Sequence, residues 1–383
     1  MNFTPILTNP YAVVALALFV LAFVYLSLYY GLVFLRVGRY REKEEVAEAE
    51  ALPGVSVVLT AHNDGDWLKE NLPYLLEQDY PNYEIVVVDY VSSDETPHIL
   101  KLCKDYYPNL KVVNFPEDVN MFRGKKYPLS IGIKSAKNDV LLFADADCMP
   151  KGFNWVRTMV KGYGPRVAQA SNGRKIILGY SGIKQEKSLF NWLQVYDNMV
   201  YNSGFLASAL LGHPFTGCGR NLSYRRSFFF DKGGFISHYT IPYGADDLFV
   251  NQNATSDNTA VVLDADAFVF SEAQPTFNSW HLLRRMRTAS YKTHRWSQRL
   301  VMAAYPLSVL FFYVAMVVML LFEWFPWQII LGVFVAKLAW QIVSVYQVDK
   351  RFEISRIHWV APLFEIYFLF ANTILKITPL PKR

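Results

Sequence analysis

The sequence has few cysteines and little net charge. Its 383 residues include only three cysteines, Cys103, Cys148 and Cys218, and the formal net charge is +5. Three cysteines without close pairing do not form a disulfide framework, which agrees with a folded portion in the cytosol. A small positive charge, without a basic patch interleaved with aromatic residues, argues against nucleic acid as a partner. We also find no long repeat and no low-complexity tract.

Ionisable groups are missing from a long N-terminal run. Residues 11–35 contain no acid or base other than tyrosine, and the run is long enough to cross a bilayer. A signal peptide is the competing interpretation, but the preceding residues lack Lys and Arg and no small-residue cleavage site follows. Basic residues begin directly afterwards at Arg36, and the positive-inside rule places them in the cytoplasm. We therefore expect residues 1–36 to hold a transmembrane helix whose N-terminus lies outside.

The C-terminal region, residues 300–383, is also poor in charge. Residues 300–322 and 328–348 each form an apolar span, and the basic residues that follow fit a cytoplasmic loop. Residues 358–377 are interrupted by Glu365, so they form either a third span or a helix that lies in the interface. We favour a span or a re-entrant helix by a narrow margin. The region thus contains two or three membrane helices.

Between a short acidic linker at 37–52 and the C-terminal spans, residues 53–299 alternate between strand and helix patterns. Short apolar, β-branched runs predict buried strands, and helical periodicity predicts the segments between them. This order gives an α/β fold with a mostly parallel, Rossmann-like sheet built by right-handed crossovers. The expected strands are 55–60, 84–89, 111–114 and 140–143, and the expected helices are 66–78, 93–104 and 127–135.

Polar residues gather where these strands end. The carboxyl ends of parallel strands meet at one edge of a sheet, where open α/β folds bind ligands. Two carboxylates at i and i+2, after the fourth strand, suit Mg²⁺ or Mn²⁺ that bridges a diphosphate. Two solvated acids at a strand end are the plainer alternative. The candidates are Thr60, His62 and Asp64 after the first strand, Asp89 after the second, and Asp145 and Asp147 after the fourth.

Several segments resemble, in order, the motifs of family 2 glycosyltransferases with the GT-A fold. The segments are residues 57–64, residues 87–96, Arg123-Gly124-Lys125 with Leu129, Asp145-Ala146-Asp147, residues 217–226 and residues 233–235. The resemblance covers about residues 53–300 and implies a membrane-anchored, inverting enzyme that uses a nucleotide-sugar donor, in the first place a UDP-sugar. One departure is clear, since Tyr90 and Val91 replace the second Asp and the Gly of the family's Val-Asp-Asp-Gly-Ser segment.

The resemblance also implies roles for the polar residues. Asp147 would bind Mn²⁺ or Mg²⁺ directly, with Asp145 directed to the ribose or to the same ion. Lys125 would pair with the base or the phosphate. The remaining donor-site residues, which would line the base and ribose, are Thr60, His62, Asp64 and Asp89.

Asp246 and Asp247 are the candidates for the catalytic base, and they resemble the family's Gly-Glu-Asp segment. Acids at a helix N-terminus are also stabilised by capping and by the helix dipole, so one of the two could simply be the cap. We favour Asp246 as the base. A base opposite the leaving group gives a single in-line displacement that inverts the anomeric centre, whereas retention would need a carboxylate nucleophile that the sequence does not identify.

The acceptor and diphosphate candidates lie further along the chain. They are Gly219, Asn221, Arg284, Arg287 and Trp296. The two arginines fit the spacing of a basic segment in the family, while Thr288 stands where the family has Trp, so Trp296 is considered in its place. A basic juxtamembrane helix attracted to anionic lipid explains the same arginines equally well.

The expected function is transfer of a sugar from a nucleotide-sugar donor to a lipid or glycan acceptor at the cell membrane. The protein would be a multi-pass inner-membrane protein with its catalytic domain in the cytoplasm. A processive polysaccharide synthase is the first alternative, although its channel usually needs more spans. A catalytically silent GT-A-like scaffold is another, and a nucleotidyltransferase would share the early motifs.

Overall fold

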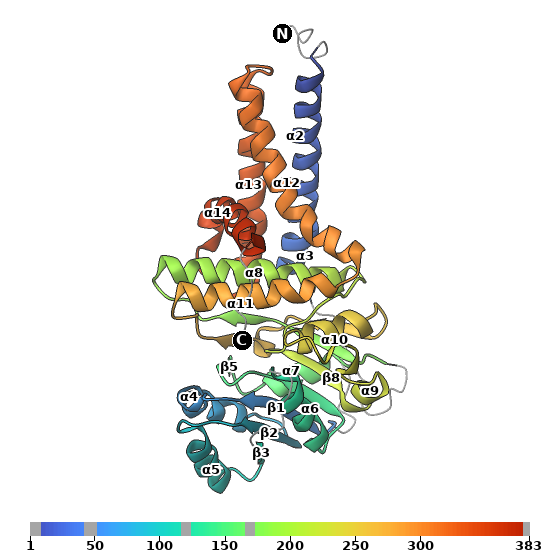
Figure 1. Ribbon diagram of the computed structural model, residues 1–383, viewed down its shortest axis with the longest axis vertical. Helices are drawn as coiled ribbons and strands as arrows, with labels where there is room; N and C mark the ends of the chain where they lie inside the picture. Colours follow the sequence, from blue (N-terminus) through green and yellow to red (C-terminus); the bar gives the residue numbers. More distant parts are fainter. Residues whose placement is uncertain (1–8, 42–51, 116–123, 165–172, 378–383) are drawn as a thin grey trace.

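The computed structural model of the protein describes residues 9–41, 52–115, 124–164 and 173–377. Most of the expected linker and Arg123 therefore lie outside the described residues. Figure 1 shows three layers: a sheet domain, then the helices α8 (Leu189–Leu210) and α11 (Phe277–Ser290) lying crosswise, then a bundle of upright helices. The two crosswise helices separate the sheet domain from the bundle.

The main sheet has the strand order β3-β2-β1-β4-β8-β6-β9. Its strands are β1 (Val55–Ala61), β2 (Tyr83–Tyr90), β3 (Leu110–Phe115), β4 (Val140–Phe143), β6 (Ile176–Gly179), β8 (Leu222–Arg225) and β9 (Thr259–Val262). The first four are parallel, and β8 runs antiparallel to both β4 and β6. The expected α/β fold with a mostly parallel sheet is confirmed, and the four strands expected from the sequence are all present.

Apolar side chains cover both faces of this sheet. Along β1, Val57 and Leu59 join one buried cluster, and Val58 joins the other, because successive side chains of a strand point to opposite faces. The helices that pack around the sheet are α4 (Gly65–Leu76), α5 (Thr96–Tyr106), α6 (Lys126–Ser135), α7 (Trp155–Lys161), α9 (Arg226–Asp231) and α10 (Ala245–Asn253). Short 3-10 turns are η2 (Ile236–His238), η3 (Ala265–Ala267) and η4 (Tyr291–Thr293).

A second, three-stranded sheet continues from the end of β4. It consists of β5 (Cys148–Pro150), β10 (Val269–Ser271) and β7 (Ser181–Ile183), with β10 antiparallel to β5 and parallel to β7. Next to β7, the Tyr180 ring stacks on Phe352 from the bundle with centroids 3.8 Å apart. The second sheet therefore lies where the sheet domain meets the membrane helices.

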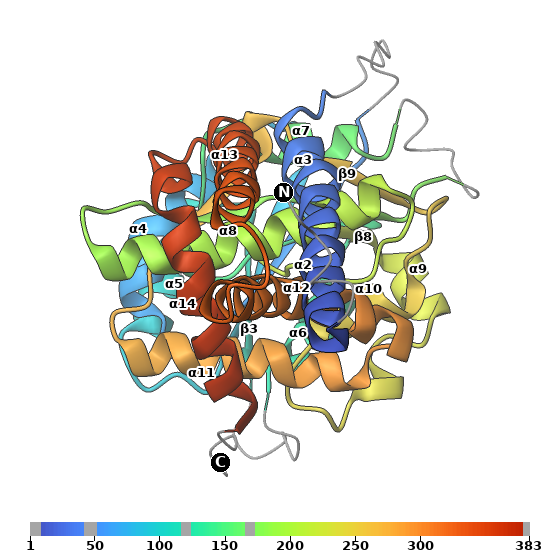
Figure 2. The same ribbon diagram turned by 90° about the horizontal axis from the view of Figure 1, so that it is seen from above.

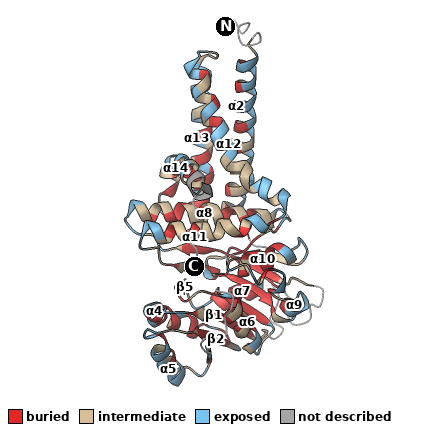
Figure 3. Cartoon of the chain, in the orientation of Figure 1, coloured by how far each residue is buried: buried red, intermediate tan, exposed pale blue. Residues whose placement is uncertain are grey.

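Three described helices are long and apolar enough to cross a membrane. They are Pro10–Gly38, which joins α2 (Pro10–Tyr29), the π-helical η1 (Tyr30–Leu35) and α3 (Arg36–Gly38), then α12 (Trp296–Leu321) and α13 (Trp327–Phe352). Figure 3 shows exposed positions along the upright bundle, and apolar residues such as Leu21 and Leu321 are among them. An apolar exposed surface of this kind suits contact with lipid. These helices coincide with the three apolar runs in the sequence.

Helix α14 (Ile357–Ile377) is the third helix of the C-terminal region, for which the sequence leaves a span, a re-entrant helix and an interfacial helix open. Figure 2 shows it lying crosswise to α13, as an interfacial helix would, and it is not among the three candidate spans of the described residues. The Glu365 carboxylate is buried in an ion pair with Lys337 of α13, so α14 packs against the bundle.

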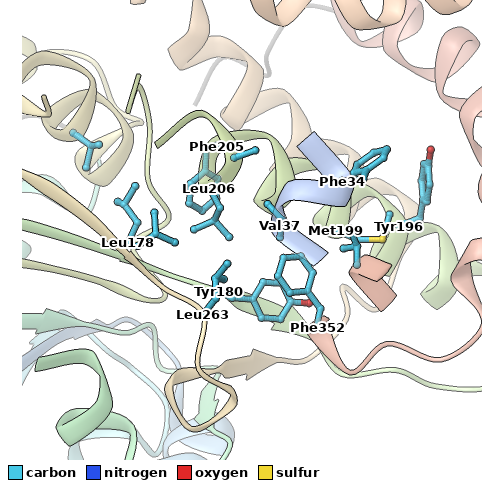
Figure 4. Close-up of a cluster of buried hydrophobic side chains, with 14 of the residues drawn as sticks. Phe34, Val37, Leu178, Tyr180, Tyr196, Met199, Phe205, Leu206, Leu263 and Phe352 are labelled. Carbon is cyan, nitrogen blue, oxygen red and sulfur yellow. The ribbon is translucent and has the colours of Figure 1, made fainter. Parts of the chain in front are cut away.

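A shared core joins the bundle to the sheet domain. Figure 4 shows Phe34 and Val37 of the first membrane helix beside Met199 of α8, with Leu178 of the sheet and Phe352 of α13 in the same cluster. All five side chains are almost completely buried. The membrane helices are therefore packed into the same core as the sheet, and they are not a tether attached to an independent domain.

Candidate active site

Asp145 and Asp147 lie in the turn between β4 and β5, at the carboxyl end of the central strand. The Lys125 ammonium lies 2.7 Å from Asp145 Oδ1. The Arg220 guanidinium lies 3.5 Å from Asp145 Oδ2 and 3.8 Å from Asp147 Oδ2. Both side chains remain partly exposed, at 30% and 21%. The pair thus faces open space and is held by two cations from distant parts of the chain.

The two carboxylates differ in their proton affinity. Burial raises the pKa of Asp145, but Lys125 and Arg220 outweigh burial and hold that pKa below its usual value. Burial also raises the pKa of Asp147; Arg220 opposes this rise and the negative charge of Asp145 adds to it. The second carboxylate therefore carries a charge that its present surroundings do not fully stabilise, and an additional cation beside it would stabilise that charge.

The acid pair suits a divalent ion that is shared with a substrate. Among the described residues, no group of three His, Cys, Asp or Glu side chains could hold a metal ion. Mg²⁺ usually takes one or two carboxylates and completes its shell with water and substrate phosphates. Asp145 and Asp147 offer that kind of donor set. They fit an ion brought with a diphosphate, and they do not fit a site made by protein alone.

The loop after β1 lies beside this pair. The Thr60 side chain lines a small recess together with Lys125 and Asp145. The His62 Nδ1 atom lies 2.6 Å from the Tyr90 carbonyl oxygen, and the His62 backbone N–H donates to Asp64 Oδ2 at 2.9 Å. Burial raises the pKa of Asp64, and the negative charges of Asp147 and Asp145 raise it further. The hydrogen bond from the His62 backbone N–H acts in the opposite direction and lowers this pKa. The structure therefore brings the loops after β1 and β4 together.

Asp89 is the last residue but one of β2 and is in register with Ala61 of β1. Its side chain is buried, and Oδ1 has no hydrogen-bond partner among the described residues. Buried polar atoms are normally paired, so an unpaired carboxylate oxygen at the ligand-binding edge of a sheet is the kind of exception that a bound ligand explains.

Asp246 and Asp247 both lie in the first turn of α10, but their surroundings differ. The Asp246 carboxylate is partly exposed, and its Oδ2 accepts a hydrogen bond from the Gly219 backbone N–H. Asp247 is buried, and its Oδ1 accepts from Thr216 Oγ1 at 2.5 Å and lies 3.0 Å from His294 Nε2. Asp246 thus faces substrate space, while Asp247 is bonded to the surrounding protein.

A cavity of about 690 Å³, which we call the first cavity, lies between the edge of the main sheet and the crosswise helices. Asp145 and Asp246 both line it, and their charges raise the pKa of Lys125 against the opposing effect of its burial. Lys125 lies 2.7 Å from Asp145 and lines the same cavity as Asp246. The predicted residues that line this cavity are Lys125, Asp145, Gly219, Asp246, Asp247 and Arg287.

Three predicted acceptor-side residues are placed elsewhere. Asn221 is 1% exposed and its amide is fully used, since it donates to Tyr180 and Ala267 carbonyls and accepts from the Trp155 indole. Trp296 begins α12, is 73% exposed and does not line the first cavity.

Arg284 is the third. It is 5% exposed and is bonded to Asp197 and Asn372, away from the first cavity. Arg284 and Arg287 are three positions apart on one helix, but they face different spaces.

The sequence reasoning missed two charged residues of the site. Arg220 contacts both acids of the pair, although it lies inside a segment whose resemblance was recognised. Asp197 of α8 binds Arg284 at 3.1 Å and Arg287 at 2.6 Å. It is the single charged residue in the 22 residues of α8, and that isolation was a signal available in the sequence.

Comparisons with known proteins agree on the kind of domain. The family model described as Glycosyl transferase family 2 matches residues 56–229. Glycosyltransferase AglE of Haloferax volcanii is 31% identical over 101 residues, which cover 26% of this chain and 32% of that protein. A poly-beta-1,6-N-acetyl-D-glucosamine synthase of Staphylococcus epidermidis is 31% identical over 101 residues, covering 26% of this chain and 23% of that protein. Beta-monoglucosyldiacylglycerol synthase of Trichormus variabilis is 30% identical over 119 residues, covering 30% and 24% respectively.

The chain therefore spans about a third or less of the length of these relatives. A solved structure extends the likeness in fold to nearly the whole chain. It is the mannosyltransferase PcManGT from Pyrobaculum calidifontis in complex with GDP-Man and Mn²⁺, with a TM-score of 0.60 and 17% identity. The likeness covers 94% of this chain and 97% of that one.

Proposed function

This chain carries a family 2 glycosyltransferase domain with the GT-A fold, and we propose that it transfers a sugar from a nucleotide-sugar donor to an acceptor at the membrane. A UDP-sugar is the first donor to consider. The observation that carries the proposal is the meeting of Asp145 and Asp246 in one cavity with Lys125, which lies 2.7 Å from Asp145. One carboxylate belongs to the candidate diphosphate site and the other is the candidate base.

The donor would bind along the edge of the main sheet. Its nucleoside would lie against the loops after β1 and β2, where Thr60, His62, Asp64 and Asp89 are placed. Asp147 and Asp145 would hold Mn²⁺ or Mg²⁺ with the diphosphate oxygens. When bound, the ion neutralises charge that develops on the leaving diphosphate. Lys125 and Arg220, which already contact the two acids, would add positive charge at the same place.

Asp246 would remove the proton from the acceptor hydroxyl. The Gly219 N–H holds one carboxylate oxygen, so the other can face the acceptor. Asp247 would hold the first turn of α10 in place through Thr216 and His294. Attack by the acceptor oxygen opposite the leaving diphosphate makes one displacement and inverts the anomeric centre.

The membrane bundle would keep this reaction at the bilayer surface, with the sheet domain in the cytoplasm. The support is the crosswise layer of α8 and α11, which lies between the site and the three candidate spans. A relative named for a polysaccharide product motivates a second candidate, a processive synthase. The length of the product distinguishes the two candidates, because a single-transfer enzyme adds one sugar to its acceptor and a processive synthase adds many.

A screen of donor hydrolysis tests the proposal. Purified full-length protein is offered UDP-sugars and, because the structural neighbour was solved with it, GDP-mannose, each with and without Mn²⁺. We expect metal-dependent release of the nucleotide. Asp147→Asn should lower turnover by roughly 100-fold or more, because a charge that stabilises the transition state is lost. Full activity in excess chelator, or an Asp147→Asn protein as active as the wild type, would sink the metal assignment.

A further inference from the structure

A second cavity lies at the level of the membrane helices. It has a volume of about 500 Å³ and is bordered by α2 with η1, α8, α12 and α14. Most of its lining is apolar or aromatic, including Leu28, Leu32, Phe205, Val309 and Phe368. A volume of this size suits a small organic ligand or part of a lipid, and two of the bordering helices, Pro10–Gly38 and α12, are candidate membrane spans.

The second cavity meets the first. Asp197 and Tyr201, both on α8, line the two cavities. Arg287 faces the first cavity and Arg284 the second, and Asp197 binds both guanidinium groups. These four side chains form the boundary between the space that holds Asp246 and the apolar space among the membrane helices. A molecule in the second cavity would therefore lie next to the candidate catalytic groups.

The charges that line the first cavity favour an uncharged head group. Five carboxylates and four cations line the first cavity, and within the described residues each of these cations already has a partner. The pairs are Lys125 with Asp145, Arg220 with Asp145 and Asp147, Arg287 with Asp197, and Lys126 with the His238 and Ile241 carbonyls. An uncharged head group leaves these pairs in place, whereas a lipid phosphate would compete with the carboxylates for the same cations that the donor diphosphate needs.

The base points to the same class of acceptor. A phosphate oxygen is already ionised near neutral pH and attacks without losing a proton. An alcohol must lose its proton as it attacks, and a carboxylate within hydrogen-bond reach supplies that step. Asp246 is partly exposed in the first cavity and accepts from a single backbone N–H among the described residues. The site is therefore equipped for a hydroxyl acceptor.

We propose that the acceptor is an uncharged lipid with a free hydroxyl group, a diacylglycerol or a glycolipid, whose apolar chain lies in the second cavity. This inference rests on the proposed function. The hydroxyl oxygen forms a bond to the anomeric carbon as the bond from that carbon to the diphosphate breaks. The proton passes to Asp246, and the electron pair of the broken bond leaves with the nucleoside diphosphate.

Gly204 offers a sharp test of the second cavity. It lines that cavity from α8, and a Cβ added there would meet no atom within 4 Å. Gly204→Leu therefore adds a side chain on the lining of this cavity, at a position where the Cβ itself has room. Gly332 of α13 is the matched control, because it also has nothing within 4 Å, is exposed, and does not line either cavity. Thermal unfolding of both variants shows whether they fold as the wild type does.

The assay uses the donor found by the hydrolysis screen and phosphatidylcholine vesicles of three kinds. One contains dioleoylglycerol, one contains monoglucosyl-dioleoylglycerol, and one contains a polyprenyl phosphate. We expect sugar to enter at least one of the two hydroxyl lipids, roughly tenfold or more above the polyprenyl phosphate. Gly204→Leu should lower this transfer roughly tenfold and raise the ratio of donor hydrolysis to transfer, whereas Gly332→Leu should do neither.

A diacylglycerol with a photoreactive acyl chain supplies a second readout that does not depend on turnover. It should label peptides of α8 or α12 in the wild type and label them less in Gly204→Leu. Three outcomes would overturn the inference, provided that donor hydrolysis persists. They are faster transfer to the polyprenyl phosphate, transfer to neither hydroxyl lipid, and unchanged transfer and labelling in Gly204→Leu. Loss of hydrolysis with every donor would instead overturn the proposed function.

Discussion

Adjacent residues of the site have different surroundings, and Asp246 and Asp247 show this most clearly. The sequence marks both as candidate bases, because acids are expected at the start of a helix in either case. Both acids line the first cavity, and only the fold shows that Asp247 is buried and bonded to Thr216 and His294 while Asp246 is partly exposed. These partners are 31 and 47 positions away from Asp247, so no local pattern could have named them.

Substituting each acid separately tests this assignment. Asp246→Asn should leave nucleotide affinity within about twofold and lower transfer by roughly 100-fold or more, because a general base commonly contributes that much. Asp247→Asn should chiefly lower the free energy of unfolding, by about 1–3 kcal/mol, because a buried charged partner of His294 is lost. Nucleotide binding, transfer and thermal unfolding are measured for both proteins. If Asp247→Asn loses transfer at unchanged stability while Asp246→Asn keeps it, the roles are reversed.

A local sequence pattern does not show contacts between residues far apart in the chain, and this explains which single residues of the site the sequence could not identify. The acid pair was predictable, since Asp145 and Asp147 directly follow an apolar strand. Arg220 was not, because its importance depends on which charges the fold places opposite it. For Asp197 the sequence shows an isolated charge in an apolar helix, but it does not show the two arginines that bind it. Asn221 is the opposite case, because the sequence marks it as a site residue and the structure does not place it in the site. Its side chain is buried in the core, where the amide bonds to Tyr180, Ala267 and Trp155.

At the scale of elements, the parallel half of the main sheet was predictable because its strands are apolar on both faces. The second sheet was not, since β5, β7 and β10 are three residues each and are too short to show a period. The loop after β2 adds a strained position. Val91 has φ of 50°, in the left-handed region, where the family segment that it resembles has Gly. A β-branched side chain is unfavourable in that conformation.

Val91→Gly should therefore raise the free energy of unfolding by about 1 kcal/mol, the order of strain stored by one left-handed residue. Val113→Gly is the matched control, because Val113 lies within β3 at an ordinary negative φ and the change should destabilise. Thermal unfolding in detergent compares both with the wild type. A lower unfolding temperature for Val91→Gly would show that the Val91 side chain contributes more through packing than it costs through strain.

At the scale of the whole molecule, the order of the parts along the chain hides how they are packed. The sequence divides into a membrane helix, a soluble region and a C-terminal membrane region. In the structure, Phe34, Met199, Leu178 and Phe352 from all three belong to one buried cluster. Apolar runs and alternating patterns locate the elements, but they do not show which faces meet. Because the membrane helices share this core with α8 and the sheet, the way they pack helps to set the position of the crosswise helices that line the first cavity.

A buried ion pair contributes to this assembly within the bundle. Lys337 of α13 and Glu365 of α14 are 1% and 3% exposed and are in contact. Glu365 Oε1 also accepts hydrogen bonds from Tyr30 at 2.6 Å and from Tyr305 at 2.8 Å, so the group joins the first membrane helix, α12, α13 and α14. Charged residues inside a membrane bundle are costly and are retained when they are paired.

Breaking this pair should loosen the whole bundle. Lys337→Met leaves the Glu365 carboxylate without its cation and should lower the free energy of unfolding by about 3–5 kcal/mol. The double variant Lys337→Met with Glu365→Gln removes both charges and keeps an acceptor for the two tyrosines, so it should recover most of that loss. Unfolding in detergent is measured for the two single variants and the double variant as a cycle. If Lys337→Met alone unfolds as the wild type does, the pair does not hold α14 against the bundle, and the crosswise position of that helix depends on its aromatic contacts.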